Sequence, residues 1–174
     1  MRWINLLFIS VVFIFLSCDL GKAELDSCLD IENYSIDTPG IGFCPELSSG
    51  SVGDEIEVKV YAVFVPDVAG IHAQIQYDAN KVDILSVTSG EFFKRSQKPI
   101  FVFDDDEEGI LDIYTFFMSN EMTTEGIGGI ASIDVRLKSP GESELKITTK
   151  SELLDPEDTE IPIKGFGKGI INAK

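Results

Sequence analysis

The residues best suited to chemistry form one acidic run, Asp104-Asp105-Asp106-Glu107-Glu108-Gly109. Carboxylates at alternating positions followed by a glycine are typical of a calcium-binding loop of the EF type. The residues at positions 1, 3, 5, 6 and 9 of such a loop are Asp104, Asp106, Glu108, Gly109 and Asp112. Position 12 holds Thr115 instead of glutamate, and a β-rich segment replaces the second helix. Two interpretations stay open: a solvated hairpin turn, and a calcium site at Asp104, Asp106, Glu108 and Asp112.

Residue types that serve in catalysis are few. His72 is the only histidine, so histidine-based proton transfer and a His/Cys zinc cluster lack their usual groups. Nucleophile-elbow, phosphate-loop and dinucleotide-binding motifs are absent from the sequence. The 30 Asp and Glu residues are numerous, but no feature singles out a pair for glycoside hydrolysis. We therefore predict a protein that is not an enzyme and has no cofactor other than the calcium considered above.

The charge balance excludes one class of partner. The chain has 174 residues, with 14 Lys and Arg against 30 Asp and Glu, which gives a formal net charge of −16. Nucleic-acid binding needs a basic face for phosphate contacts, so we expect no nucleic-acid partner. Hydrophobic residues make up 44% and charged residues 25% of the chain, which is typical of a globular protein. This length fits roughly one domain.

The N-terminus has the pattern of an export signal. Arg2 precedes the mostly apolar residues 3–16, a segment shorter than the roughly 20 residues of a membrane-spanning helix. Ser17-Cys18 follows, and this arrangement resembles the lipobox of bacterial lipoproteins, in which the cysteine is lipidated after cleavage. We expect a signal peptide at 1–17, a lipid anchor in the bilayer at Cys18 and a location in the cell envelope outside the cytoplasm. The alternative is an ordinary secretory signal cut nearby.

Two further cysteines, Cys28 and Cys44, lie sixteen positions apart. Export favours oxidation, so an even pair is most simply one disulfide. Closing such a loop contributes about 3 kcal/mol in the chain-entropy model. The alternative is a pair of buried thiols. We assign residues 18–46 to a tether and disulfide-tied lead-in.

Alternating apolar and polar residues predict strands through most of the remaining chain. The first has Ile56, Val58, Val60, Ala62 and Phe64 on its inner side, and Pro66-Asp67 is expected to end it. Residues 119–127 are expected to form a short helix or loop. Because no long helical pattern occurs, the sequence predicts an all-β sandwich. The other expected strands lie at 71–77, 82–88, 99–103, 110–118, 133–137, 145–147, 161–163 and 166–171.

The pair Phe116-Phe117 predicts an exposed or covered aromatic. Successive side chains of a strand point to opposite faces, so only one of the two can enter the core. An outward aromatic beside Met118 would suit a protein interface. The alternative is that residues 119–127 cover it.

Several segments with recognisable residues follow one another in a characteristic order along the chain. They are Gly50 to Glu55, Gly70 to Asp78, Val82 to Val87, Gly90 to Phe92, Gly109 to Ile113, Gly129 to Val135, Pro140 to Leu145, and Leu154 to Ile171. In this order they resemble a cohesin domain over about residues 47–173. The resemblance implies that residues 47–174 form a jelly-roll sandwich of about nine strands. It also implies binding to dockerins, which are small calcium-loaded helical modules of secreted enzymes and scaffold proteins.

The resemblance also implies a place for the partner, because cohesins use one flat sheet face. That face includes the strand before Tyr77-Asp78 and the strand after the central hairpin. The outward residues expected there are His72, Gln74, Gln76, Asp112, Tyr114, Phe116 and Met118. The best-known dockerin binders have an Asn and an Asp early in the first of these strands. Gly70 and His72 occupy about those places here.

These observations predict a lipid-anchored, extracytoplasmic module that docks a dockerin-bearing protein and has no catalytic activity. Two alternatives stay open. One is a carbohydrate-binding module of a related sandwich fold that uses Tyr114 to bind polysaccharide, although Trp3, the only tryptophan, lies in the signal. The other is a structural envelope lipoprotein.

Overall fold

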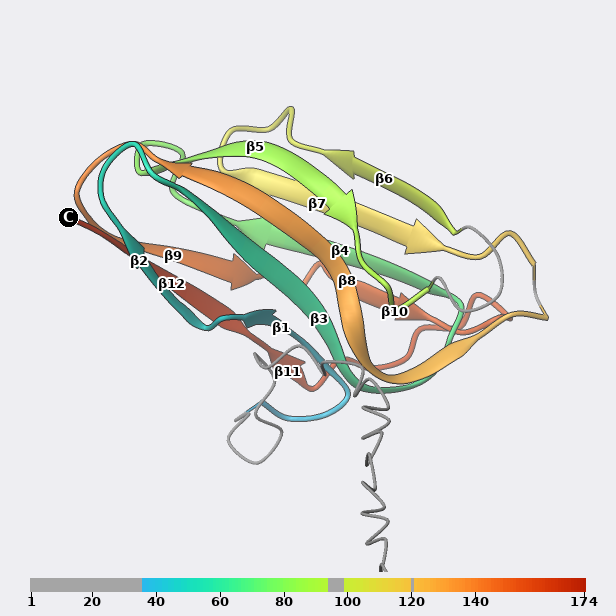
Figure 1. The fold of residues 1–174 in the computed structure, drawn as a ribbon. Coiled ribbons are helices and arrows are strands. Elements are labelled where there is room, and N and C mark those ends of the chain that lie inside the picture. The colour runs from blue at the N-terminus through green and yellow to red at the C-terminus, as the bar shows by residue number, and fades with distance from the viewer. Residues whose placement is uncertain (1–35, 94–98, 120) are drawn as a thin grey trace, which may run out of the picture.

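Two β-sheets account for most of the structure, a computed structural model that describes residues 36–93, 99–119 and 121–174 (Figure 1). The first sheet has the order β11-β1-β3-β8-β5. All its neighbours pair antiparallel except β1 and β11, which are parallel. Its strands are β1 (Gly40–Cys44), β3 (Glu55–Val68), β5 (Val82–Ser89), β8 (Thr124–Leu137) and β11 (Gly165–Phe166).

The second sheet has the order β2-β12-β9-β4-β7-β6, and the short β10 also pairs with β4. Its central strands β4 and β7 are antiparallel over their whole length. The strands are β2 (Leu47–Gly50), β4 (Gly70–Gln76), β6 (Ile100–Asp104), β7 (Ile110–Phe116), β9 (Gly141–Ile147), β10 (Glu152–Leu154) and β12 (Lys168–Ala173).

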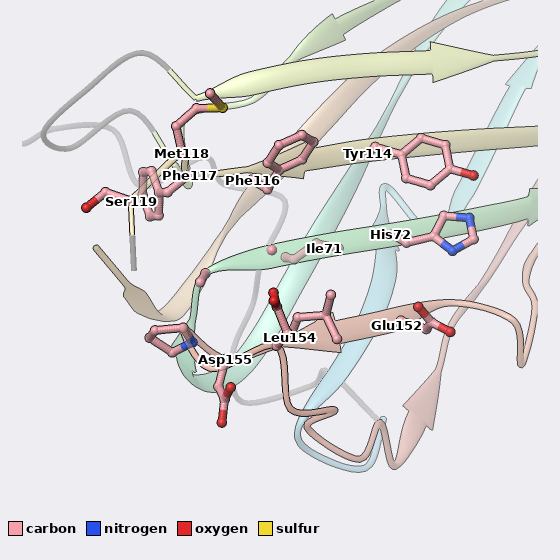
Figure 2. Close-up of a pocket in the computed structure, with 14 residues that line it drawn as sticks. Ile71, His72, Tyr114, Phe116, Phe117, Met118, Ser119, Glu152, Leu154 and Asp155 are labelled. Atoms are coloured by element: carbon pink, nitrogen blue, oxygen red, sulfur yellow. The ribbon is translucent and has the colours of Figure 1, made fainter. Parts of the chain in front are cut away.

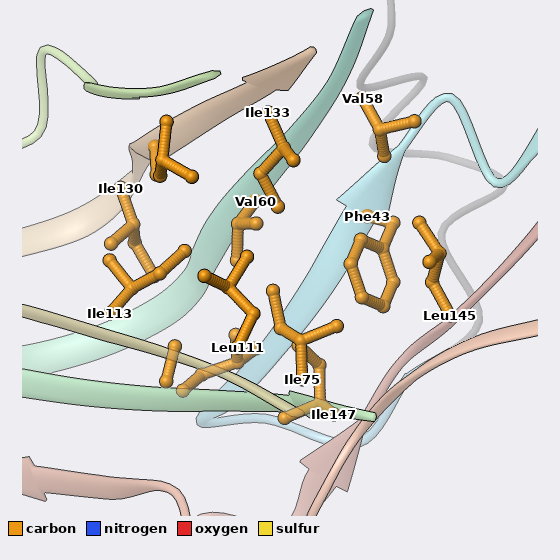
Figure 3. Close-up of a cluster of buried hydrophobic side chains, with 14 of the residues drawn as sticks. Phe43, Val58, Val60, Ile75, Leu111, Ile113, Ile130, Ile133, Leu145 and Ile147 are labelled. Atoms are coloured by element: carbon orange, nitrogen blue, oxygen red, sulfur yellow. The ribbon is translucent and has the colours of Figure 1, made fainter. Parts of the chain in front are cut away.

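The core lies between the two sheets (Figure 3). Most strands contribute alternate side chains, as period-two patterning requires. Those from the first sheet include Phe43, Val58, Val60, Ile130 and Ile133, and those from the second include Ile75, Leu111, Ile113, Leu145 and Ile147. The all-β sandwich is therefore confirmed, and the described residues contain twelve strands and no helix.

The predicted end of β3 at Pro66-Asp67 is wrong. The strand continues to Val68 because two register shifts, between Ala62 and Val65 and between Val65 and Val68, absorb the extra residues. Phe64, with φ of 47°, lies in the first irregular stretch and is 53% exposed instead of pointing inward. Proline is tolerated in a bulge because the ladder there needs no N–H donor.

Other segments also differ from the prediction. Residues 161–163 form no strand, and only Glu160 makes an isolated bridge, to Leu154. The predicted helix or loop at 119–127 is shorter, because β8 begins at Thr124. The lead-in contributes a strand of its own, β1, which pairs with β3 and β11, so the sandwich begins before residue 47.

Across the described residues, no helix has the length and apolar character to cross a membrane.

The predicted modification sites lie near or beyond the described N-terminal limit. Cys44 is 1% exposed on β1 and is disulfide-bonded. Cys28, its predicted partner, lies outside the described residues, as does Cys18, so both the pairing and the lipid anchor stay predictions.

Candidate functional site

The outward side chains of β10, β4, β7 and β6 lie in rows, because the strand register pairs them directly. One row consists of Glu152, His72, Tyr114 and Val102. The next consists of Leu154, Gly70, Phe116 and Ile100. We call this surface, together with Asp112 and Met118, the β4–β7 face. It brings together side chains that are far apart in the sequence.

His72 links the two central strands of this face. Its Nε2 lies 2.6 Å from Asp112 Oδ1 and, because a carboxylate oxygen accepts, the ring nitrogen donates. The imidazole stacks on the Tyr114 ring, with centroids 4.5 Å apart and planes 8° from parallel. The hydrogen bond to Asp112 and the stack together fix the orientation of His72 and Tyr114 relative to each other.

Gln74 differs from the other predicted face residues because it is only 7% exposed. Its Nε2 donates to Asp112 Oδ1 at 3.0 Å, and its Oε1 accepts from Thr148 Oγ1 at 2.8 Å. Its backbone N–H donates to Ser151 Oγ at 3.0 Å. Gln74 therefore supports Asp112 from below the surface, while Gln76 is exposed at the end of β4.

The face exposes three large apolar side chains. Tyr114 is 38%, Phe116 37% and Met118 78% exposed. Phe117 points the other way and packs against the core beside Phe93, with ring centroids 4.9 Å apart. The prediction that only one of Phe116 and Phe117 enters the core is confirmed, and Phe116 stays exposed instead of being covered. Aromatic and methionine side chains of this kind are typical of protein interfaces.

A hollow of about 360 Å³ opens at one end of the face (Figure 2). Phe116 and Met118 line one side and Leu154 the opposite side, with Gly70 between them in the row. His72, Tyr114 and Glu152 continue the lining along the sheet. The hollow therefore combines an apolar interior with a polar border.

Carboxylates dominate the electrostatics of the face. The pKa of Tyr114 is raised above its usual 10.0, mainly by desolvation and then by the charges of Asp112, Asp104 and Glu152. The phenol therefore stays neutral and able to donate a hydrogen bond at physiological pH. Tyr77, which packs against the core, also has a raised pKa, first through burial and then through the charge of Asp105.

Sequence analysis missed four members of the face: Ile100 and Val102 on β6, and Glu152 and Leu154 on β10. The two on β10 were the hardest to predict, because this three-residue strand has its partner β4 about eighty positions earlier in the chain. The one available signal was the alternation around Leu153, which is 0% exposed. Three residues are too few for alternation to predict a strand.

The acidic run forms the turn between β6 and β7, as the hairpin interpretation predicts. Asp104 Oδ1 accepts the backbone N–H of Asp106 at 3.0 Å, and Gly109 has φ of 82°. Asp112 Oδ1 is bound to His72 and Gln74. In the part of the chain that the structure describes, no three His, Cys, Asp or Glu side chains are grouped to hold a metal ion. The geometry therefore gives the calcium hypothesis for Asp104, Asp106, Glu108 and Asp112 no support.

The family model of the cohesin domain matches residues 45–170. This range includes β2 to β11 and the first half of β12. The chain belongs to the cohesin family. Cohesin domains are protein-binding modules without catalytic activity. The recognition made from the order of sequence segments is therefore confirmed.

Solved cohesins share this fold at low sequence identity. A non-cellulosomal cohesin from the archaeon Archaeoglobus fulgidus is 14% identical, with a TM-score of 0.63 over 78% of this chain and 91% of that chain. A type II cohesin from the cellulosome of Acetivibrio cellulolyticus is 18% identical, with a TM-score of 0.67 over 78% and 96%. The cohesin of a type I cohesin–dockerin complex from Clostridium thermocellum is 19% identical, with a TM-score of 0.63 over 78% and 99%. No curated protein matches the chain.

Proposed function

We propose that this cohesin docks a dockerin-bearing protein on the β4–β7 face and, through a lipid on Cys18, holds that protein at the cell envelope. The observation that supports docking is the set of exposed apolar side chains Tyr114, Phe116 and Met118 along and just beyond β7, beside which Val102 of β6 is also exposed. A monomeric domain rarely leaves such a contiguous apolar surface open without a partner.

Solved relatives support the same class of partner. Cohesins from Clostridium thermocellum and Acetivibrio cellulolyticus have been solved in complex with dockerins. This chain has Gly70 and His72 early in β4, where the best-known dockerin binders have Asn and Asp. The partner is therefore a dockerin whose docking surface differs from the best-known class.

Binding is tested by calorimetry of the full chain, kept in detergent, against the dockerin modules encoded in the same genome. One calcium-loaded dockerin is expected to bind with Kd of about 1 µM or tighter, which corresponds to about −8 kcal/mol. Chelation should abolish binding, because dockerins are calcium-loaded modules whose folding is coupled to the metal. Absence of any interaction with all of these modules would contradict the proposal. Retardation by polysaccharide in a native gel would instead favour the carbohydrate-binding alternative.

The anchor is tested separately by mass spectrometry of the membrane-bound protein. The N-terminal peptide is expected to begin at Cys18 and to have the mass of a lipidated cysteine, and Cys18→Ser should release the protein from the membrane. The matched control is Ser17→Ala, which keeps a small residue before the cysteine and should leave the protein anchored. An unmodified Cys18 in membrane-bound material would exclude the lipid anchor and leave docking unaffected.

A further inference from the structure

Gly70 lies between Phe116 and Leu154 in the row and leaves part of the hollow open because it has no side chain. A Cβ built on Gly70 would lie 3.4 Å from Phe116 Cβ and 3.9 Å from Leu154 Cβ, both ordinary contacts. Gly70 also lies outside the positive-φ region that favours glycine. Neither the backbone conformation nor local packing therefore requires glycine at this position. The effect of the glycine is to leave space between the side chains of Phe116 and Leu154.

The walls of this space are apolar and adaptable. The exposed Phe116 and Met118 lie on one side of the space, and the half-buried Leu154 faces them from β10 (Figure 2). Methionine adjusts its shape to a guest because its side chain is long and unbranched. A side chain with several methylene or methyl groups would displace water from these walls, whereas a short polar group would leave them wet.

The border of the hollow is acidic. The lining includes Glu152, Asp155 and Asp158 and contains neither Lys nor Arg. Asp155 Oδ1 is engaged by the backbone N–H groups of Glu157 and Thr159, at 2.9 and 2.8 Å, while Glu152 and Asp158 are exposed. With a net charge of −16 over the whole chain, this border attracts a cationic group and repels an anionic one.

We propose that the hollow takes one long apolar side chain of the docked protein, and that a Lys or Arg beside it on the same protein lies against Glu152 and Asp158. This inference rests on the proposed docking function and specifies the chemistry of the partner's docking surface. It predicts which partners are excluded: those with Ser, Thr or an acidic residue at the position that faces the hollow.

Filling the hollow tests the apolar half. Gly70→Val places a β-branched side chain, which suits a strand, between Phe116 and Leu154. Its affinity for the dockerin identified by calorimetry should fall about 30-fold or more, as for the loss of a central anchor. Gly70→Ala adds only a methyl group and should produce a smaller loss, with both variants melting within a few degrees of the parent. Unchanged affinity in Gly70→Val would overturn the inference and leave the proposed function standing.

Reversing one charge tests the second part of the proposal, the contact between a partner's Lys or Arg and the acidic border. Glu152→Lys should weaken binding about 10-fold and reduce its dependence on salt, since a rim charge acts mainly on association. The matched control is Glu142→Lys, which makes the same charge change at an exposed position of β9 and should alter affinity less than 2-fold. Equal effects of the two substitutions would show that only net charge matters, which would overturn the assignment of a cation to this border.

A small probe separates this inference from the docking function. In NMR titrations of the full chain, N-acetyl-Leu-Lys-Lys-amide should shift the resonances of Gly70 and Met118, whereas the Ser-Lys-Lys and Leu-Glu-Glu peptides should not. Those shifts without binding of any dockerin would support the hollow's specificity and reject the dockerin as its occupant. Equal shifts from all three peptides would overturn the inference. Self-association that Gly70→Val abolishes would assign the hollow to a second copy and would also overturn it.

Discussion

Phe116→Ser is expected to leave the fold intact and to weaken docking about 30-fold, whereas Phe117→Ser should destabilise the domain by about 3 kcal/mol. The two residues are adjacent but point to opposite sides of the second sheet. Phe116 is 37% exposed on the β4–β7 face, while Phe117 packs against the core and the buried Phe93. Removing an exposed ring leaves no cavity, whereas removing a packed ring does.

The measurement combines urea unfolding, followed by far-UV circular dichroism, with calorimetry against the identified dockerin. Each variant is the control for the other, because both make the same chemical change one residue apart. If both substitutions unfold the domain, Phe116 is a core residue and the docking face loses its main support. If Phe116→Ser binds as well as the parent, the partner contacts another surface.

Alternation predicted the central strands of the face because β4 and β7 follow it without interruption. Ile71, Ala73 and Ile75 are buried and His72 points outward, as the pattern requires. At the end of β3 the same rule failed, because a bulge inserts residues that belong to neither face and turns Phe64 outward. Pro66 marks this stretch in the sequence, but a proline fits the end of a strand as well as a bulge, so it could not distinguish the two.

Gln74 shows why exposure could not be predicted at every outward position. It has the same parity as His72, but Thr148 and Ser151 cover it from 74 and 77 positions away. Glu152 and Leu154 reached the face in the same way, through a short strand that only the fold places beside β4. The strand pattern thus predicted which sheet surface is used, while the hollow depends on long-range pairing that one sequence does not reveal.

Gly90→Ala is expected to destabilise the domain by about 3 kcal/mol or more. A Cβ at Gly90 would lie 2.1 Å from the carbonyl oxygen of Gly129 and 2.8 Å from the carbonyl carbon of Ile130. Both are backbone atoms of β8, so no side-chain rotation relieves the clash. The Gly90 N–H also donates to the Ile130 oxygen at 2.8 Å, and moving the strands apart would break this hydrogen bond.

Gly129→Ala is the matched control on the facing strand. Its Cβ would lie 3.8 Å from the Tyr61 ring, an ordinary contact, and the residue has no positive φ. This variant should be as stable as the parent or up to about 1 kcal/mol more stable, because alanine loses less backbone entropy on folding. Urea unfolding of both variants measures the contrast. Equal stability of Gly90→Ala and Gly129→Ala would show that β5 and β8 separate easily at this point.

Gly90 also connects the packing of the core to the docking surface. Gly90 lets the chain after β5 lie against β8, where the Phe92 N–H donates to the Gly129 oxygen at 2.9 Å. This contact holds the following Phe93 beside Phe117, one residue after the exposed Phe116. Gly90→Ala should therefore weaken docking as well as stability, although it touches no residue of the β4–β7 face. Gly129→Ala should weaken neither docking nor stability, which separates a general effect of an added methyl group from loss of this support.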